Sequence, residues 1–217
     1  EVAQSQIVDV DGIRILAVER FDRLKASDGR LLRIPQEDFC QALSVPSIRK
    51  YNNDGGPGIR ECLGLLAGSD YAEEDRLAFL KAQIVFWLIG ATDGHAKNFS
   101  LFLTPGGRYR MTPLYDIMSL QPNYAAKQLR RKEFRLSMAV GDNRNYAVES
   151  ILPYHFLEDA KAAGMAQDRV RSLFGSLGET IEGALERTVA IMPDDFPKLL
   201  FERIGDAMRK RSAKFLN

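Results

Sequence analysis

The sequence predicts an α+β protein that is mostly helical, with its strands grouped into two hairpins. Short apolar runs flank the Asp-Gly pair at positions 11–12, a dipeptide that favours the tight turn of a β-hairpin. Two further runs, residues 99–103 and 109–111, flank a Thr-Pro-Gly-Gly turn and predict a second hairpin in the middle of the chain. Apolar residues at three- and four-residue steps fill most of the remainder, which is typical of helices.

The composition is that of an ordinary globular protein of 217 residues, 45% hydrophobic and 27% charged. Such a chain forms one domain or two small ones around a buried core. A net charge of +1 does not by itself indicate binding to nucleic acid or to a membrane. Cys40 and Cys62 lack metal-site spacing, so we expect free thiols in a bacterial cytoplasm. We find no membrane-spanning run and no signal peptide, and a chain beginning at Glu1 is expected to start partway into a longer protein.

The first part of the chain is predicted to run from strands into a short helix. Residues 7–20 form the first hairpin, and its second half, residues 13–18, is apolar enough for a central strand. Residues 31–34 predict another short strand. Residues 35–43 predict a short helix, because Pro stands at its start and acids in its first turn. Residues 44–58, rich in Asn, Gly and Pro, predict a connecting loop.

Two helices are predicted next, at residues 59–66 and 71–89. Five residues of the second helix follow helical spacing and are interpreted as core: Leu77, Leu80, Ile84, Trp87 and Leu88. The Asp93-Gly94 pair breaks the helical pattern, because Gly permits backbone angles that other residues resist.

The second half is predicted to be a basic loop followed only by helices. Residues 120–135 are poor in apolar side chains and contain five clustered cations: Lys127, Arg130, Arg131, Lys132 and Arg135. Helices are predicted at residues 153–163 and 169–191, and from a cap at residues 193–195 to about residue 214. An apolar stripe predicts that one face of the 169–191 helix is buried, although three glycines argue against an unbroken helix.

Four polar residues stand out around the central hairpin: Asp93, His95, Asn98 and Asp116. A protein kinase needs a carboxylate at the accepting hydroxyl, plus an Asn and a further Asp that hold magnesium. Asn98 lies five positions after Asp93, as in the common kinase signature, and Asp116 follows the hairpin. On spacing alone, a loop that ends the helix, with Asp and Asn as its turn residues, is the favoured interpretation.

Hydrolase chemistry fits the same residues poorly. A Ser-His-Asp arrangement of Asp93, His95 and Ser100 lacks a nucleophile elbow, and a metal hydrolase would need a second histidine near His95. The other histidine, His155, is interpreted as a surface or core residue of a helix.

The sequence segments around these residues resemble those of a known family. TDGHAKNFS and MTPLYDIMS, together with ALSVPSIRKYNNDGGPGI and LAVERFDR, closely resemble the HipA family of serine/threonine kinase toxins, and the resemblance covers nearly the whole chain. It implies a protein-kinase-like C-lobe of helices with a small β-hairpin at the active site and remnants of an N-lobe sheet. Residues 1–34 would be the end of that sheet and the hinge, and residues 35–217 the helical catalytic lobe.

The resemblance also implies the site and its cofactors, ATP and Mg²⁺. Asp93 would be the catalytic carboxylate, and Asn98 and Asp116 the magnesium ligands. His95 and Lys97 would lie beside the phosphates of ATP. The backbone of Glu19 and Phe21 would pair with adenine, although the interpretation from sequence alone is a solvated strand end.

Partners follow from the same resemblance. HipA-like toxins bind a HipB-like antitoxin dimer and, with it, operator DNA; Lys161 matches one basic DNA-contact position, whereas Gly164 stands where a second basic residue would help. The protein substrate would be translation-related, with glutamyl-tRNA synthetase suggested by the family. The basic residues 127–135 would lie in an activation loop, and they are at least as well explained by a solvated loop as by substrate docking.

Two functions remain open at this point. No glycine-rich phosphate loop and no strand lysine precede the implied hinge. The first possible function is therefore an incomplete kinase, whose N-terminal lobe lies elsewhere, even on a separate chain. In that case residues 1–217 alone are expected to be inactive. The second is a non-catalytic kinase-like module that binds an antitoxin and operator complex. The joint presence of Asp93, Asn98 and Asp116 favours the enzyme.

Overall fold

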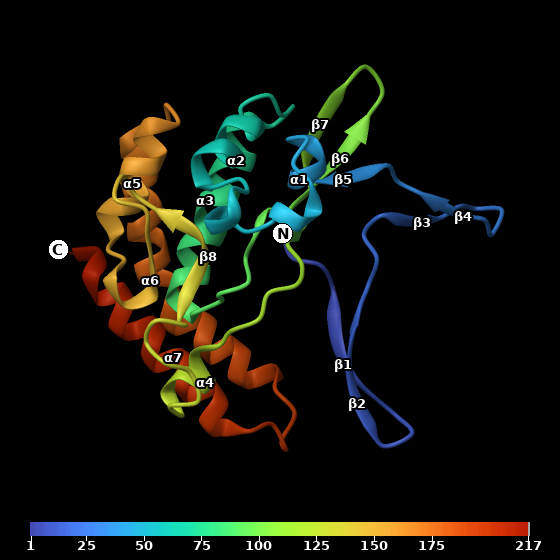
Figure 1. The fold of residues 1–217 in the computed structure, drawn as a ribbon. Helices are drawn as coiled ribbons and strands as arrows, with labels where there is room; N and C mark the ends of the chain where they lie inside the picture. Colours follow the sequence, from blue (N-terminus) through green and yellow to red (C-terminus); the bar gives the residue numbers. More distant parts are fainter. Residues whose placement is uncertain (217) are drawn as a thin grey trace.

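The computed structural model describes residues 1–216, with side chains as far as Phe215. Figure 1 shows a helical body and, to one side of it, two long β-hairpins built from the first part of the chain. A hydrophobic core runs through the helical body and includes Phe39, Leu63, Trp87, Phe99 and Phe156. No helix of residues 1–216 is long and apolar enough to cross a membrane.

The first hairpin forms as the sequence predicts. β1 (Ser5–Val10) pairs antiparallel with β2 (Ile13–Val18), and the turn residues Asp11 and Gly12 both have positive φ, at 53° and 77°. Among residues 1–216, β2 pairs with β1 alone and most of its side chains are exposed, so the predicted central strand would need a second partner strand from outside these residues. β3 (Arg23–Lys25) and β4 (Leu31–Arg33) form the second long hairpin.

The helix predicted at residues 35–43 is shorter than expected. β5 (Gln36–Asp38) instead pairs with β6 (Ser100–Thr104), and only then does α1 (Phe39–Ala42) begin. Asp38 accepts a hydrogen bond from the Gln41 backbone while the Gln41 side chain accepts one from the Asp38 backbone. This reciprocal cap starts the helix after Asp38, so the acids precede the helix.

The central hairpin and the main helices are confirmed. β6 pairs with β7 (Arg108–Met111) across the predicted turn. Short 3₁₀ turns at Ser47–Arg49 and Asn52–Asp54 interrupt the loop that leads to α2 (Ile59–Leu66) and α3 (Ala72–Ile89). Of the residues interpreted as core in α3, four are buried and Leu77 is half-buried.

The expectation that only helices follow the basic loop is wrong. β8 (Arg135–Val140) pairs with β9 (Asn145–Ala147), and five of the six β8 residues are buried. A short helix, α4 (Gln121–Ala125), also interrupts the predicted loop. An apolar run as short as that of β8 fits a buried strand or a helix equally, so sequence periodicity could not distinguish them.

The remaining helices keep their predicted places with altered ends. α5 (Pro153–Ala162) ends before Gly164, and α6 (Gln167–Ile191) continues through its glycines because an apolar face, from Val170 to Leu185, packs into the core. α7 (Lys198–Ser212) begins at Pro197 rather than at residues 193–195, and Asp195 pairs with Arg14 instead, at 2.5 Å. A last 3₁₀ turn spans Ala213–Leu216.

His155 is a buried helix residue, which leads to a prediction about stability. Its side chain is 4% exposed, and Nδ1 accepts a hydrogen bond from the Leu152 backbone at the start of α5. Burial lowers the pKa of His155 below its ordinary value of 6.5. The unfolded chain therefore takes up a proton at a higher pH than the folded chain, and stability is lost as pH falls below about 6.5.

His155→Asn keeps an acceptor near the position of Nδ1 but cannot be protonated in this range. We expect the wild type to lose more free energy of unfolding than this variant between pH 7.5 and pH 5.5, as measured by urea denaturation. Both proteins retain His95, so the difference isolates His155. Parallel stability curves over this range would contradict the prediction.

Candidate active site

The loop that carries Asp93 begins where α3 ends. Gly90 adopts a left-handed conformation at the helix C-terminus, with φ 67°, and the Ala91 N–H donates to the Phe86 carbonyl. One residue after Ala91, the Thr92 carbonyl accepts a hydrogen bond from Ser137 Oγ of β8 at 2.6 Å. The missed strand β8 therefore anchors this loop from outside.

Gly94 is required because the loop lies directly against a core ring. A Cβ at Gly94 would stand 2.4 Å from a ring carbon of Phe86, far closer than such atoms approach in proteins. The close approach places Asp93 and His95 on top of Phe86, at the edge of the core. The His95 N–H then donates to the Asp93 carbonyl at 2.8 Å, which tightens the turn.

Asn98 and Asp116 meet although 18 residues separate them in sequence. Asn98 Nδ2 donates to Asp116 Oδ2 at 3.1 Å and to the Asp116 carbonyl at 3.2 Å. Asp116 has φ 56°, a conformation that costs a non-glycine residue about 1 kcal/mol or more. The hydrogen bonds from the buried Asn98 side chain therefore hold Asp116 Oδ2 and the Asp116 carbonyl oxygen on the same side of this strained residue.

These two residues offer oxygen ligands of the kind that Mg²⁺ prefers. With Nδ2 occupied by Asp116, Asn98 leaves its amide oxygen as an acceptor, and the Asp116 carboxylate is exposed. Within residues 1–216 no group of three His, Cys, Asp or Glu side chains is placed to hold a metal by itself. A pair of oxygen ligands fits an ion that takes its other ligands from phosphates and water.

His95 lies between these groups and is largely inaccessible to water. Its side chain is 7% exposed, and Nε2 lies 3.9 Å from Asp93 Oδ1. Burial lowers the pKa of His95, so the ring is neutral near pH 7. Nδ1 has no hydrogen-bond partner among the described residues, so the ring retains an unused polar atom.

Tyr51 is a site residue that the sequence analysis did not identify. Its hydroxyl donates to Asp93 Oδ1 at 3.0 Å, and its ring packs edge-on against His95, with centroids 5.1 Å apart. Tyr51 comes from residues 44–58, where the sequence predicts only a connecting loop. Nothing in the local sequence indicates a partner 42 positions away, so only the fold reveals it.

The other predicted residues lie at varied distances from this centre. Lys97 Nζ pairs with Asp38 Oδ2 at 2.5 Å, so its ammonium points to the start of α1. The Phe21 ring packs against Tyr115, whose hydroxyl donates to the Lys97 carbonyl, so the end of the first hairpin reaches the site. Glu19 is exposed, and its N–H already donates to the Gln4 carbonyl.

Lys161 is exposed on α5 and belongs to a different part of the molecule from these groups. The structure therefore brings together Asp93, His95, Asn98 and Asp116, and it adds Tyr51.

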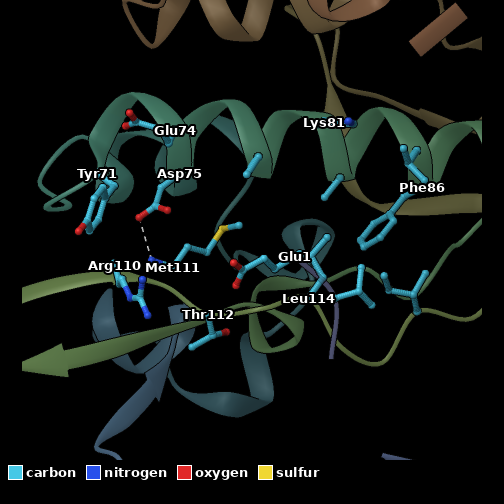
Figure 2. Close-up of a pocket in the computed structure, with 15 residues that line it drawn as sticks. Glu1, Tyr71, Glu74, Asp75, Lys81, Phe86, Arg110, Met111, Thr112 and Leu114 are labelled. Carbon is cyan, nitrogen blue, oxygen red and sulfur yellow. Dashed lines mark hydrogen bonds between the residues drawn. The ribbon is translucent and has the colours of Figure 1, made fainter. Parts of the chain in front are cut away.

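A cleft of about 540 Å³ lies beside the site, between α3 and the segment from β7 to Ile117 (Figure 2). Its walls include Tyr71, Glu74 and Arg110, and the Asp75 carboxylate accepts a hydrogen bond from the Met111 N–H. Asp93, Asn98 and Asp116 are not part of its lining. The residues of the polar cluster therefore do not form the walls of this cleft.

The fold is kinase-like. It superposes on the proinflammatory kinase CtkA of Helicobacter pylori with a TM-score of 0.55 over 98% of this chain and 77% of that one, at 10% identity, which is a likeness of fold alone. It superposes far better, with a TM-score of 0.86, on HipA of Shewanella oneidensis in its complex with HipB and operator DNA. That match has 25% identity and covers 99% of this chain and 52% of the other.

The chain belongs to the HipA-like C-terminal domain family, which matches residues 1–185. Y4mE of Sinorhizobium fredii, a protein named as a kinase, is 35% identical over 195 residues, covering 87% of this chain and 44% of that protein. The serine/threonine-protein kinase toxin HipA of Shewanella oneidensis is 28% identical over 205 residues, covering 88% of this chain and 45% of the toxin. The chain thus spans about half the length of these relatives.

The Tyr51 hydroxyl gives the first prediction about this site. A hydrogen bond to a charged acceptor contributes about 1.5–3 kcal/mol, and its loss frees the Asp93 side chain. On the proposal below that the whole protein transfers a phosphoryl group, we expect Tyr51→Phe to lower its kcat by about tenfold or more, because 1.4 kcal/mol corresponds to about tenfold. The KM for ATP should not change.

Tyr109→Phe is the matched control, since the Tyr109 hydroxyl donates to the Leu65 carbonyl and does not reach Asp93. Steady-state kinetics of both variants would separate the two effects. If Tyr51→Phe behaved like Tyr109→Phe, the hydroxyl would have no role in positioning Asp93.

Proposed function

We propose that this chain is the ATP- and magnesium-binding catalytic half of a HipA-like serine/threonine protein kinase toxin. The observation that carries the proposal is the contact between Asn98 and Asp116, beside Asp93 on a loop fixed by the core. Kinase chemistry depends on such positioning, because the transferred phosphoryl group needs oriented reactants and charge stabilisation rather than a covalent intermediate. A module that only bound partners would have no need of all three residues.

In this proposal Asp93 accepts the proton of the serine hydroxyl. Its carboxylate is half exposed, at 47%, so an incoming hydroxyl can reach it, while Tyr51 holds one of its two oxygens. The other oxygen then faces the substrate. Fixing the carboxylate in this way lowers the entropic cost of bringing the base to the hydroxyl.

Asn98 and Asp116 would hold Mg²⁺ through the oxygens described above. The ion neutralises charge on the phosphates when it is bound. The Asn98 amide keeps the Asp116 carboxylate in place, and the strained backbone of Asp116 directs its oxygens to the same side. Both residues would thus be arranged before ATP arrives.

The remaining contacts to ATP would come from four residues. The backbone of Glu19 and Phe21 would pair with adenine; because the Glu19 N–H is already bonded to Gln4, its carbonyl is the group that remains. His95, neutral and with Nδ1 unpaired, would donate to a phosphate oxygen. Lys97 would reach a phosphate only by leaving Asp38.

The whole protein would belong to a type II toxin–antitoxin system. By likeness to the Shewanella complex, its partners would be a HipB-like antitoxin dimer and operator DNA, with Lys161 as a basic contact on α5. Its substrate would be a serine of a translation-related protein, for which glutamyl-tRNA synthetase is the family's suggestion.

The chain spans about half of its relatives, so we propose that further residues complete the site. They would supply the glycine-rich loop and the lysine that hold the phosphates from the opposite side. We place the division between the lobes at residues 34 and 35, because β5 already pairs with β6 of the helical body. Residues 1–34 would then belong to the other lobe and the hinge.

Asp93→Asn tests the catalytic assignment. The amide keeps the size of the side chain but cannot accept the hydroxyl proton, so we expect kcat to fall by about 100-fold or more while ATP affinity stays nearly unchanged. The whole gene product would be assayed by radiolabelled transfer to a protein substrate. Transfer at the wild-type rate would rule out Asp93 as the base, whereas no transfer by the wild type itself would favour the alternative of a non-catalytic module that binds an antitoxin and operator complex.

Asp116→Ala tests the metal assignment by a different measurement. Removing the carboxylate should weaken ATP binding in the presence of magnesium by about tenfold, and should change it little when magnesium is replaced by EDTA. Isothermal titration calorimetry under both conditions gives the comparison. Equal losses with and without magnesium would show that Asp116 acts on ATP in some other way.

A further inference from the structure

A pocket of about 410 Å³ lies on the face of the helical body formed by α7 and α4, which Figure 1 shows side by side. The α7 face and the 3₁₀ turn after it contribute residues at three-, four- and seven-residue steps: Arg203, Ala207, Lys210, Arg211 and Lys214. The small Ala207 leaves space between the cations. Gln121 and Tyr124 of α4 form the opposite wall.

Arg211 is the unusual member of this face, because it is buried without a carboxylate. Its side chain is 8% exposed; Nη1 donates to the Leu88 carbonyl at 2.7 Å and Nη2 to Gln121 Oε1 at 2.6 Å. Both acceptors are neutral. Burial lowers the pKa of Arg211 to about 10, and the negative charge of Glu149 only partly opposes this effect.

The two acids that line the pocket are already paired with arginines outside it. Glu149 accepts from Arg131 Nε at 2.9 Å and from the Tyr124 hydroxyl at 2.6 Å. Asp206 Oδ1 lies 3.3 Å from Arg209 Nη1. In the described part of the chain, none of Arg203, Lys210, Arg211 and Lys214 forms an ion pair with a carboxylate.

We propose that this pocket binds a phosphate group. Four cations converge on it, one of them buried with N–H groups still available, and two lysines supply mobile point charges at the rim. A guanidinium with flanking ammonium groups is the donor set that recognises the several oxygens of a phosphate. The site is independent of the proposed catalytic centre, because it uses none of that centre's residues.

The bound phosphate would join α7 to the segment that follows Asp116. Gln121 and Tyr124 lie on that segment, and Arg211 bonds to both Gln121 and the end of α3. The phosphate could come from free inorganic phosphate or from a nucleic acid backbone. The experiment separates these two sources.

The test uses the whole gene product and inorganic phosphate as the first probe. Calorimetric titration with phosphate, at constant ionic strength set by NaCl, should show saturable binding with a Kd of about 1 mM or tighter. Lys210→Glu combined with Lys214→Glu should weaken it by at least tenfold. These residues are exposed or half-buried, so the fold should survive, and circular dichroism would verify that it does.

Lys198→Glu, compared with Lys210→Glu alone, is the matched control, because each makes one Lys→Glu change on α7 and only Lys210 lines the pocket. It should bind phosphate as the wild type does. A short single-stranded oligonucleotide forms the second arm; binding tighter than phosphate, with the same sensitivity to Lys210→Glu and Lys214→Glu, would assign the site to backbone phosphate. The proposal would be overturned if neither phosphate nor the oligonucleotide showed saturable binding. It would also be overturned if Lys198→Glu weakened phosphate binding as much as Lys210→Glu does.

Discussion

The last turn of α3 carries backbone carbonyls that the helix itself cannot satisfy, and two different parts of the chain bind to them. Arg211 of α7 donates to the Leu88 carbonyl, and Ser119 Oγ, just after Asp116, donates to the Ile89 carbonyl at 2.5 Å. The Leu120 N–H donates to the carbonyl of Gly90. The loop bearing Asp93 leaves from this same point, so the two halves of the candidate site share one anchor.

This anchor explains why the surrounding positions are so restricted. A Cβ at Gly90 would stand 2.6 Å from the Phe134 ring, and Gly90 also needs its positive φ to end the helix. The Arg211 guanidinium lies over Phe134, 5.7 Å from the ring centroid. A cation at a helix C-terminus is favourable because it faces the negative end of the helix dipole. Arg211 thus satisfies a carbonyl, complements the dipole and covers an aromatic ring.

Local sequence was sufficient to predict the elements whose cause is local. The Asp-Gly turn between β1 and β2, the extent of α3 and the left-handed end of α5 at Gly164 follow from residue types alone. Elements determined by distant partners were missed: β5 is a strand because it pairs with β6, more than 60 positions away. The same contrast holds for the candidate site. The spacing of Asp93, Asn98 and Asp116 made them predictable from the sequence, whereas no local pattern marks Tyr51.

The first hairpin has apolar side chains on both faces, although β2 pairs with β1 alone among the described residues. Ile15 and Leu16 are neighbours on β2, so they face opposite sides of the ribbon, and they are 43% and 66% exposed. A ribbon with apolar residues on both faces is the pattern of a strand covered on both sides, which was the basis for expecting a central strand. The relatives extend well beyond the length matched here, and added strands or helices would cover these faces. The apolar surface of β1 and β2 therefore supports the proposal that this hairpin belongs to a larger sheet, which would face Asp116 across the nucleotide.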